Sequence, residues 1–169
     1  MTSNDSARGT LGIGEDGTFR IRFERHLPHR PDRVWAWLTE PDLLQQWLPG
    51  CRIEPEVGSA VRYDFGEEGS ATGTVTTVEP PAADGAGCLI HGWVWEGVPE
   101  SEVVWELVPA DGGTLLTLTH REVLPEPAAE FAVGWHVMLD ALTLAADGSP
   151  EPVESAWANL EQVAAYYAS

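Results

Sequence analysis

Residues 88–123 read CLIHGWVWEGVPESEVVWELVPADGGTLLTLTHREV, and this stretch decides the fold of the chain. Hydrophobic and polar side chains alternate along 88–96, 101–108 and 114–123, which is the pattern of half-buried β-strands. Asp111-Gly112-Gly113 separates the second segment from the third, and glycine supplies the positive φ angles of a tight hairpin turn. Short connections between neighbouring strands predict an antiparallel sheet.

The residues upstream add further strands to this sheet, with a helical region between the first of them and the rest. FRIRFERHL at 19–27 alternates in the same way, and further strand patterns lie at 61–65 and 71–79. Between the first strand and these two, Pro31 and Pro41 each begin a short stretch with helical spacing, where proline suits the first helical position. We therefore expect two short helices after the first strand.

From Glu126 to Asp147 the apolar spacing changes to the period of a helix, which Gly148 ends. A sheet with one apolar face needs a cover, and this helix is the obvious one. The order of elements predicts an α+β fold, a curved antiparallel sheet wrapped around a long C-terminal helix, plus two short helices. His136 and Asp140 form an i, i+4 pair on the helix stripe that we expect to be exposed.

Composition limits the number of domains and the classes of partner. The 169 residues suit one domain, for which we expect a flexible N-terminal tail at 1–17, the domain itself at 18–148 and a C-terminal helical extension at 149–169. That extension has three alternatives: it packs on the sheet, covers a cavity or makes a dimer contact. The net charge of −18 argues against nucleic acid and anionic membranes as partners. Residues 86–169 hold thirteen acids against Arg121 alone, so that half should present a negative surface.

The chain has no lysine, which excludes Schiff-base chemistry and a Walker-type phosphate loop. It has no apolar run of the roughly 20 residues that span a bilayer, and its first residues lack the apolar core of a signal peptide. Cys51 and Cys88 lack the spacing of a zinc site or of a secreted disulfide framework. We therefore expect a cytoplasmic protein with reduced cysteines, no metal and no cofactor.

Four stretches together resemble a known family: VWAWLTEPDLLQQWLPG at 34–50, WVWEG at 93–97, SEVVWELVPADGGTLLTLTHRE at 101–122 and GWHVMLDAL at 134–142. They are similar to the domain related to the activator of the heat-shock-protein-90 ATPase, in the START-like (SRPBCC) helix-grip superfamily. The resemblance covers roughly residues 19–147 and implies a helix-grip (START/Bet v-like) fold. Members of this family bind or transform unrelated ligands, so the resemblance does not name a function. The eukaryotic co-chaperone also has an N-terminal domain, which we do not expect before residue 18.

Strand alternation, matched to the family pattern, places large aromatic rings and two histidines on one face of the sheet, under the long helix. An aromatic enclosure with a few polar groups is typical of a small-molecule pocket. The alternative is that the tryptophans simply fill the core, the role that we assign to Trp35 and Trp47. The predicted cavity residues are Tyr63, Phe65, His91, Trp93, Trp95, Trp105, His120, Phe131, Trp135 and Leu139.

His91, His120 and Tyr63 are the ionisable side chains that the pattern directs inward. They could transfer protons, or each histidine could satisfy one buried partner. A catalytic histidine usually needs an orienting carboxylate, and strand parity directs Asp64 and Glu106 to the other face. We therefore predict no catalytic residue. His26 and His29 lie in a predicted loop without further metal ligands.

Three functions remain open. The first is binding of a small hydrophobic or aromatic molecule in the cavity. The second is an enzyme such as a cyclase, dehydratase or hydrolase that acts on an aromatic or polyketide-like substrate. The third is a chaperone regulator or stress-related interaction module, which would use a chaperone contact. A homodimer is compatible with all three.

Overall fold

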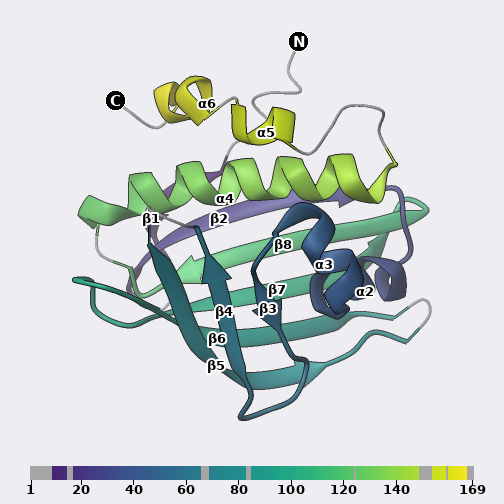
Figure 1. Ribbon diagram of the computed structural model, residues 1–169. Coiled ribbons are helices and arrows are strands. Elements are labelled where there is room, and N and C mark those ends of the chain that lie inside the picture. The colour runs from purple at the N-terminus through teal and green to yellow at the C-terminus, as the bar shows by residue number, and fades with distance from the viewer. Residues whose placement is uncertain are drawn as a thin grey trace.

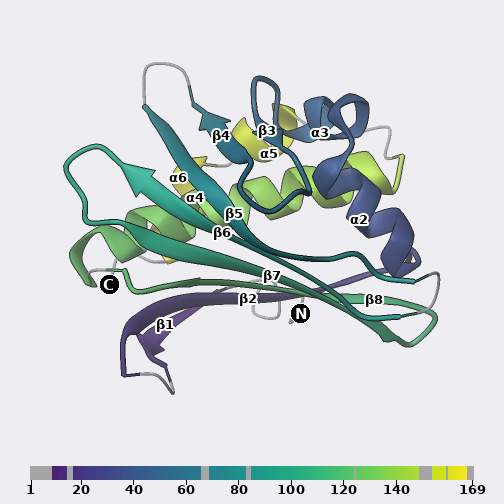
Figure 2. The same ribbon diagram turned by 90° about the horizontal axis from the view of Figure 1, so that it is seen from below.

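The computed structural model describes residues 9–14, 17–65, 69–82, 85–123, 125–148, 154–158 and 160–166. These residues form an eight-stranded antiparallel sheet in the order β1-β2-β8-β7-β6-β5-β4-β3. The sheet curves into an open trough (Figure 2). Its strands are β1 Thr10–Ile13, β2 Phe19–Leu27, β3 Arg52–Ile53, β4 Ala60–Asp64, β5 Ser70–Glu79, β6 Gly87–Trp95, β7 Ser101–Ala110 and β8 Gly113–Arg121.

A long helix, α4 (Pro125–Ala146), crosses the concave face of the sheet (Figure 1). Two short helices, α2 (Pro31–Thr39) and α3 (Pro41–Trp47), lie at one end of the trough. The predicted α+β fold, with a curved antiparallel sheet around a long helix and two short helices, is confirmed.

The β7–β8 hairpin closes with the turn that the sequence predicts. Ala110 pairs with Gly113, which leaves Asp111 and Gly112 as the two loop residues. Both have positive φ angles, 48° and 79°, as the turn types that match the twist of a hairpin require.

β5 and β6 approach each other closely at a pair of glycines. A Cβ atom added to Gly73 would collide with the backbone carbonyl of Gly92 on the neighbouring strand. The pairing register of these strands shifts between Val75 and Thr77, which marks a β-bulge. Bulges bend the strands that carry them, so this one adds to the curvature of the sheet.

The predicted N-terminal tail is in part a strand. Thr10–Ile13 forms β1 and pairs with β2, from Thr10 opposite Arg22 to Ile13 opposite Phe19. The edge of β2 offers unpaired backbone groups that even a short, glycine-containing segment can satisfy. The flexibility of the tail stays a prediction. Residues 1–8 and 15–16 of the predicted tail lie outside the described residues.

The aromatic residues of α2 and α3 pack as predicted for core. Trp47 is fully buried and Trp35 nearly so. The Trp47 indole N–H donates to the backbone carbonyl of Trp37 at 2.9 Å, which fixes α3 against α2.

α4 is covered on more sides than its sequence pattern indicates. The His136–Asp140 pair exists, with 3.6 Å between Nε2 and Oδ2, but His136 is buried rather than exposed. Its ring packs edge-on against Phe23 of β2, and Asp140 accepts a hydrogen bond from Arg25 of the same strand at 2.9 Å. The sheet curves far enough for β2 to cover this side of the helix, which a helical period alone cannot reveal.

The C-terminal extension packs against α4. Its described parts are α5 (Glu154–Ala158) and α6 (Leu160–Tyr166), both in contact with α4 on the side away from the sheet (Figure 1). Ala156 and Val163 are buried there. α4 is therefore held between the sheet and the extension, while residues 149–153, 159 and 167–169 lie outside the described part.

Candidate functional site

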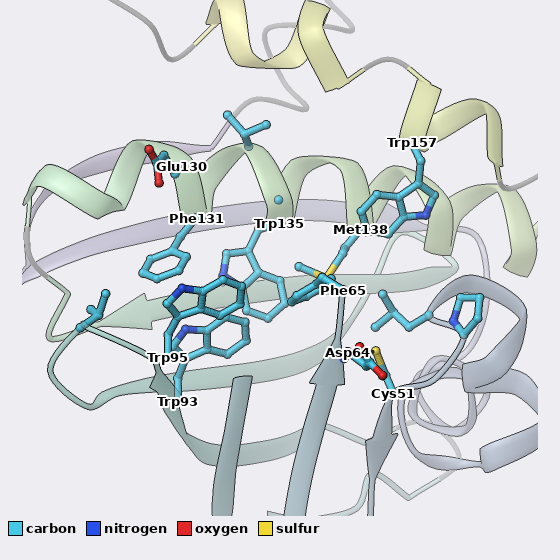
Figure 3. Close-up of a pocket in the computed structure, with 15 residues that line it drawn as sticks. Cys51, Asp64, Phe65, Trp93, Trp95, Glu130, Phe131, Trp135, Met138 and Trp157 are labelled. Atoms are coloured by element: carbon cyan, nitrogen blue, oxygen red, sulfur yellow. Dashed lines mark hydrogen bonds between the residues drawn. The ribbon is translucent and has the colours of Figure 1, made fainter. Parts of the chain in front are cut away.

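A pocket of about 610 Å³ lies between the sheet and α4, towards the end of the trough where β4 and β6 finish (Figure 3). The strands contribute Asp64, Phe65, Trp93 and Trp95, and the loop after α3 closes one side. Trp157 of α5 reaches past α4 to close another side. Its lining consists of Leu48, Pro49, Cys51, Asp64, Phe65, Trp93, Trp95, Val98, Glu130, Phe131, Val133, Gly134, Trp135, Met138 and Trp157. We call it the outer pocket.

Aromatic rings form the wall of the outer pocket. Trp93 and Trp95 follow each other on one face of β6, with parallel rings whose centroids lie 6.3 Å apart. Phe131 of α4 packs edge-on against both, at 5.8 Å from Trp93 and 5.9 Å from Trp95. Phe65 adds a fourth ring at 5.9 Å from Trp95. Trp95, Phe65 and Phe131 are only partly buried, so part of this wall is accessible.

Among the described residues, three ionisable side chains line the outer pocket: Cys51, Asp64 and Glu130. Cys51 is buried, and its sulfur accepts the backbone N–H of Asp64 at 3.4 Å. Burial raises the pKa of the Cys51 thiol, so it stays protonated and weakly nucleophilic at neutral pH. Asp64 follows the outward parity expected of β4, yet the pocket reaches it where the strand ends.

Deeper in the trough, the rings of Tyr63 and Trp105 pack around His91. Its Nδ1 lies 2.8 Å from the backbone carbonyl of Gly92, which can only accept, so Nδ1 carries the proton. Nε2 is therefore an acceptor, for the Tyr63 hydroxyl at 3.1 Å and the Trp105 indole N–H at 3.4 Å. All of these side chains are fully buried.

His120 is held in the opposite tautomer. The indole N–H of Trp135 donates to its Nδ1 at 3.0 Å, so the proton of the neutral ring is on Nε2. Nε2 then donates to the Ser101 hydroxyl at 2.7 Å. We call Tyr63, His91, Ser101, Trp105 and His120 the inner cluster.

Burial sets the protonation of the inner cluster. Desolvation lowers the pKa of His91 to about 4 and, with a smaller contribution from His91, that of His120 to about 3. Desolvation also raises the pKa of the Tyr63 hydroxyl. Both imidazoles are neutral at pH 7, and no carboxylate in the described part of the chain hydrogen-bonds either of them. The geometry matches the alternative in which these histidines satisfy buried partners.

The ten predicted cavity residues all lie on the concave side but divide into two groups. Phe65, Trp93, Trp95, Phe131 and Trp135 line the outer pocket. Tyr63, His91, Trp105, His120 and Leu139 lie outside its lining and are almost completely buried. Ligand binding by any of them stays a prediction.

One polar atom of the pocket wall is unsatisfied. The Trp93 indole N–H is buried and finds no hydrogen-bond acceptor among the described residues. A buried donor without an acceptor costs roughly 1–3 kcal/mol.

Sequence patterns missed several residues of the pocket. Trp157 lies in the extension, and although its helical spacing was visible, its position beside α4 depends on a chain reversal that no motif specifies. Glu130 and Gly134 flank the predicted helix stripe at Phe131 and Trp135. The sequence pattern left either Met138 or Leu139 on that stripe, and it is Met138 that lines the pocket.

The remaining histidines and cysteines make local contacts. His26 Nε2 lies 2.8 Å from the carbonyl of Ala110, and His29 Nε2 lies 2.7 Å from Asp147. Cys51 and Cys88 are free. Within the described ranges, no group of three or more His, Cys, Asp or Glu side chains could hold a metal ion. Across those same ranges, no helix is long and apolar enough to cross a membrane.

Solved structures share this architecture. CalU16 from Micromonospora echinospora is 27% identical, with a TM-score of 0.71 and 95% of each chain covered. DynU16, a protein in the dynemicin biosynthetic locus, is 27% identical with a TM-score of 0.65, over 79% of this chain and 49% of that one. The Aha1 dimer from Colwellia psychrerythraea, at 21% identity, a TM-score of 0.63 and coverage of 78% and 98%, supports the fold alone.

No curated protein sequence matches the chain. A family model does match, over residues 28–147, and its description is Activator of Hsp90 ATPase homolog 1-like protein. The matched region runs from the end of β2 to the end of α4 and so contains most of the trough, the inner cluster and most of the outer pocket. The chain therefore belongs to the Activator of Hsp90 ATPase homolog 1-like family, within the helix-grip superfamily that its sequence resembles.

Proposed function

We propose that the chain binds a small aromatic or hydrophobic molecule in the outer pocket. The observation that carries this proposal is the pocket itself, about 610 Å³ of space bounded by tryptophan and phenylalanine rings. Sites for small molecules usually measure roughly 300–1,000 Å³ and combine apolar walls with a few polar groups.

The wall chemistry favours a planar ligand. Ring faces and edges of Trp93, Trp95 and Phe131 offer offset-stacked and edge-on contacts, which add roughly 0.5–1.5 kcal/mol per aromatic pair beyond area burial.

The inner cluster favours binding over proton transfer. Both nitrogens of His91 and of His120 have partners, and neither imidazole belongs to the pocket lining. A general base must reach the substrate proton within hydrogen-bond distance. An enzyme that acts on an aromatic substrate would need to open this cluster first.

Two further observations support small-molecule binding inside the cell. DynU16 is a protein in the dynemicin biosynthetic locus, which supports a role connected with small molecules. The two cysteines are unpaired, as is typical of reducing compartments, and we propose the cytoplasm as the location.

Gly134 provides a way to test the site. It lies on α4 in the pocket lining, and the nearest atom to a Cβ built there is the Met138 methyl carbon, at 3.9 Å. Gly134→Phe should fill the pocket, whereas Gly134→Ala should leave most of it open and stabilise α4 by up to about 1 kcal/mol.

The test is native mass spectrometry and isothermal titration calorimetry with a library of aromatic and polyketide-like compounds. We expect ligands that bind the native protein and Gly134→Ala but lose at least about tenfold in affinity for Gly134→Phe, for a cost of about 1.4 kcal/mol or more. Equal binding by all three proteins would place the ligand elsewhere. Binding of no compound by the native protein would contradict the proposal.

Self-association and a chaperone contact remain alternatives for partners. The Colwellia psychrerythraea relative is a dimer, which supports a proposal that this chain also pairs with itself. Size-exclusion chromatography with light scattering measures this directly, and a monomer at all concentrations would exclude it. A pull-down with the chaperone tests the second contact, and no binding would exclude that one.

A further inference from the structure

The ionisable groups of the outer pocket share one sign of charge. Asp64 and Glu130 are carboxylic acids, and Cys51 is a thiol that burial keeps neutral. No arginine or histidine in the described ranges lines the pocket, and the sequence contains no lysine. Charge at the site is therefore negative.

Of the two carboxylates, Glu130 has the negative charge that is less offset by nearby cations. It is exposed on α4, directly before Phe131, and forms no ion pair with any described residue. Asp64 lies 4.0 Å from Arg62, whose side chain is 58% exposed. Water screens such an exposed pair.

The aromatic wall adds a second preference for cations. The faces of Trp93, Trp95 and Phe131 carry the negative part of the ring quadrupole, and a cation within about 6 Å of a ring centroid is attracted to it. Such contacts contribute from about 0.5 to 2 kcal/mol, depending on how far the cation is desolvated. A carboxylate in the same place would face ring electrons and two like charges.

The negative charge of residues 86–169 also favours a cationic ligand. Thirteen acidic residues and one arginine lie in 86–169, which supplies β6, α4 and α5 to the site. A field of one sign raises the local concentration of ligands of the opposite charge.

We propose that the outer pocket selects aromatic ligands that carry a protonated amine and rejects those that carry a carboxylate. This inference rests on the proposed binding function and adds the charge class of the ligand. The ring system contacts the tryptophans, and the ammonium group lies at the rim near Glu130, while Asp64 lies at the opposite end of the lining (Figure 3).

Three probes of matched size test the selection: 2-naphthylmethylamine, 2-naphthalenemethanol and 2-naphthoate. Calorimetric titration at pH 7 and low ionic strength should rank them amine, alcohol, carboxylate. We expect about a tenfold difference in dissociation constant between the first two, since an ion pair and a cation–π contact together contribute about 1.4 kcal/mol. Added salt should narrow the difference.

Variants distinguish the effect of the pocket carboxylates on ligand preference from the effect of the protein's overall charge. Glu130→Gln should reduce the preference for the amine about three- to fivefold, and Asp64→Asn, at the opposite end of the lining, should reduce it less. Glu106→Gln is the matched control, because it removes one exposed negative charge from β7, away from the pocket, and should leave the ranking unchanged.

The outcomes are distinguishable. If the amine and the alcohol bind equally, or the carboxylate binds best, the charge selection is wrong while the binding function stands. If Glu106→Gln lowers the preference as much as Glu130→Gln does, the pocket carboxylates do not cause it and the inference fails. If none of the three probes binds the native protein, the inference and the proposed function both fail for naphthyl ligands.

Discussion

The inner cluster and the outer pocket are built from the same kinds of residue on the same concave face, yet one is closed and the other is open. In the inner cluster, both histidines and the polar atoms of Tyr63, Ser101 and Trp105 have hydrogen-bond partners. In the outer pocket, the rings of Trp95 and Phe131 are partly accessible, and the Trp93 N–H lacks an acceptor. Both regions are rich in aromatic rings, so aromatic content alone does not determine where the trough is closely packed. The closely packed region is the one in which the polar atoms of the rings hydrogen-bond to one another.

The largest test of this contrast is truncation of one tryptophan from each region. Trp105→Ala removes a fully buried ring and a donor to His91, so we expect the free energy of unfolding to fall by about 3–5 kcal/mol. Trp95→Ala removes a partly exposed ring next to empty space, and should cost less than half as much. Urea denaturation of both variants measures the difference. If Trp105→Ala itself fails to fold, Trp105→Phe keeps an aromatic ring in the core and still removes the donor. Equal costs would mean that the two regions are equally packed.

Acid should weaken the inner cluster selectively. In the folded protein His91 and His120 have pKa values of about 4 and 3, below the ordinary value near 6.5 of an unfolded chain. Between these values the unfolded chain binds more protons, so the stability that the neutral histidines contribute is fully present above pH 6.5 and is lost as the pH falls. Each should contribute a slope of about 1.4 kcal/mol per pH unit between pH 6 and 4.

The measurement is urea denaturation at several pH values in the native protein and in His120→Gln. The variant should lose the part of the slope that His120 contributes. A slope that is the same in both proteins would show that other groups cause the acid sensitivity.

The smallest effect is expected at one hydroxyl. Ser101→Ala leaves the Nε2–H of His120 buried without an acceptor, which should cost about 1–2 kcal/mol. Ser101→Thr keeps the hydroxyl and is the control for volume. Since Ser101 does not line the outer pocket, ligand affinity should not change. A loss of affinity in Ser101→Ala would mean that the two regions are coupled.

Sequence patterns predicted the fold and the sidedness of the rings, because both follow from local periodicity. Alternation in β6, β7 and β8 placed His91, Trp105 and His120 on the covered face, and the turn at Asp111-Gly112 fixed the register between two of these strands. The strand β1 was missed because Thr10–Ile13 is short and contains Gly12, so its pairing depends on β2 rather than on its own propensity.

The empty part of the trough could not be predicted from alternation. Beside Trp95, some space stays empty. Its other boundaries are the loop around Pro49 and the side chains of Met138 and Trp157, which do not fill it. Those contacts join four separate segments, and small changes in any of them would change the volume. Periodicity predicts the face of the sheet on which a side chain lies. It does not predict how closely the neighbouring side chains pack around it.

The strand order has a consequence for the growing polypeptide. β2 is the first long strand to be synthesised, but one of its edges pairs with β8, the last strand, from Arg20 opposite Arg121 to Leu27 opposite Thr114. β3 to β8 follow one another as neighbours and can assemble as they leave the ribosome, whereas β2 must wait for about 90 further residues. During that interval its exposed edge could join another nascent chain, and Arg20, Arg22 and Arg25 place repelling charges along that strand.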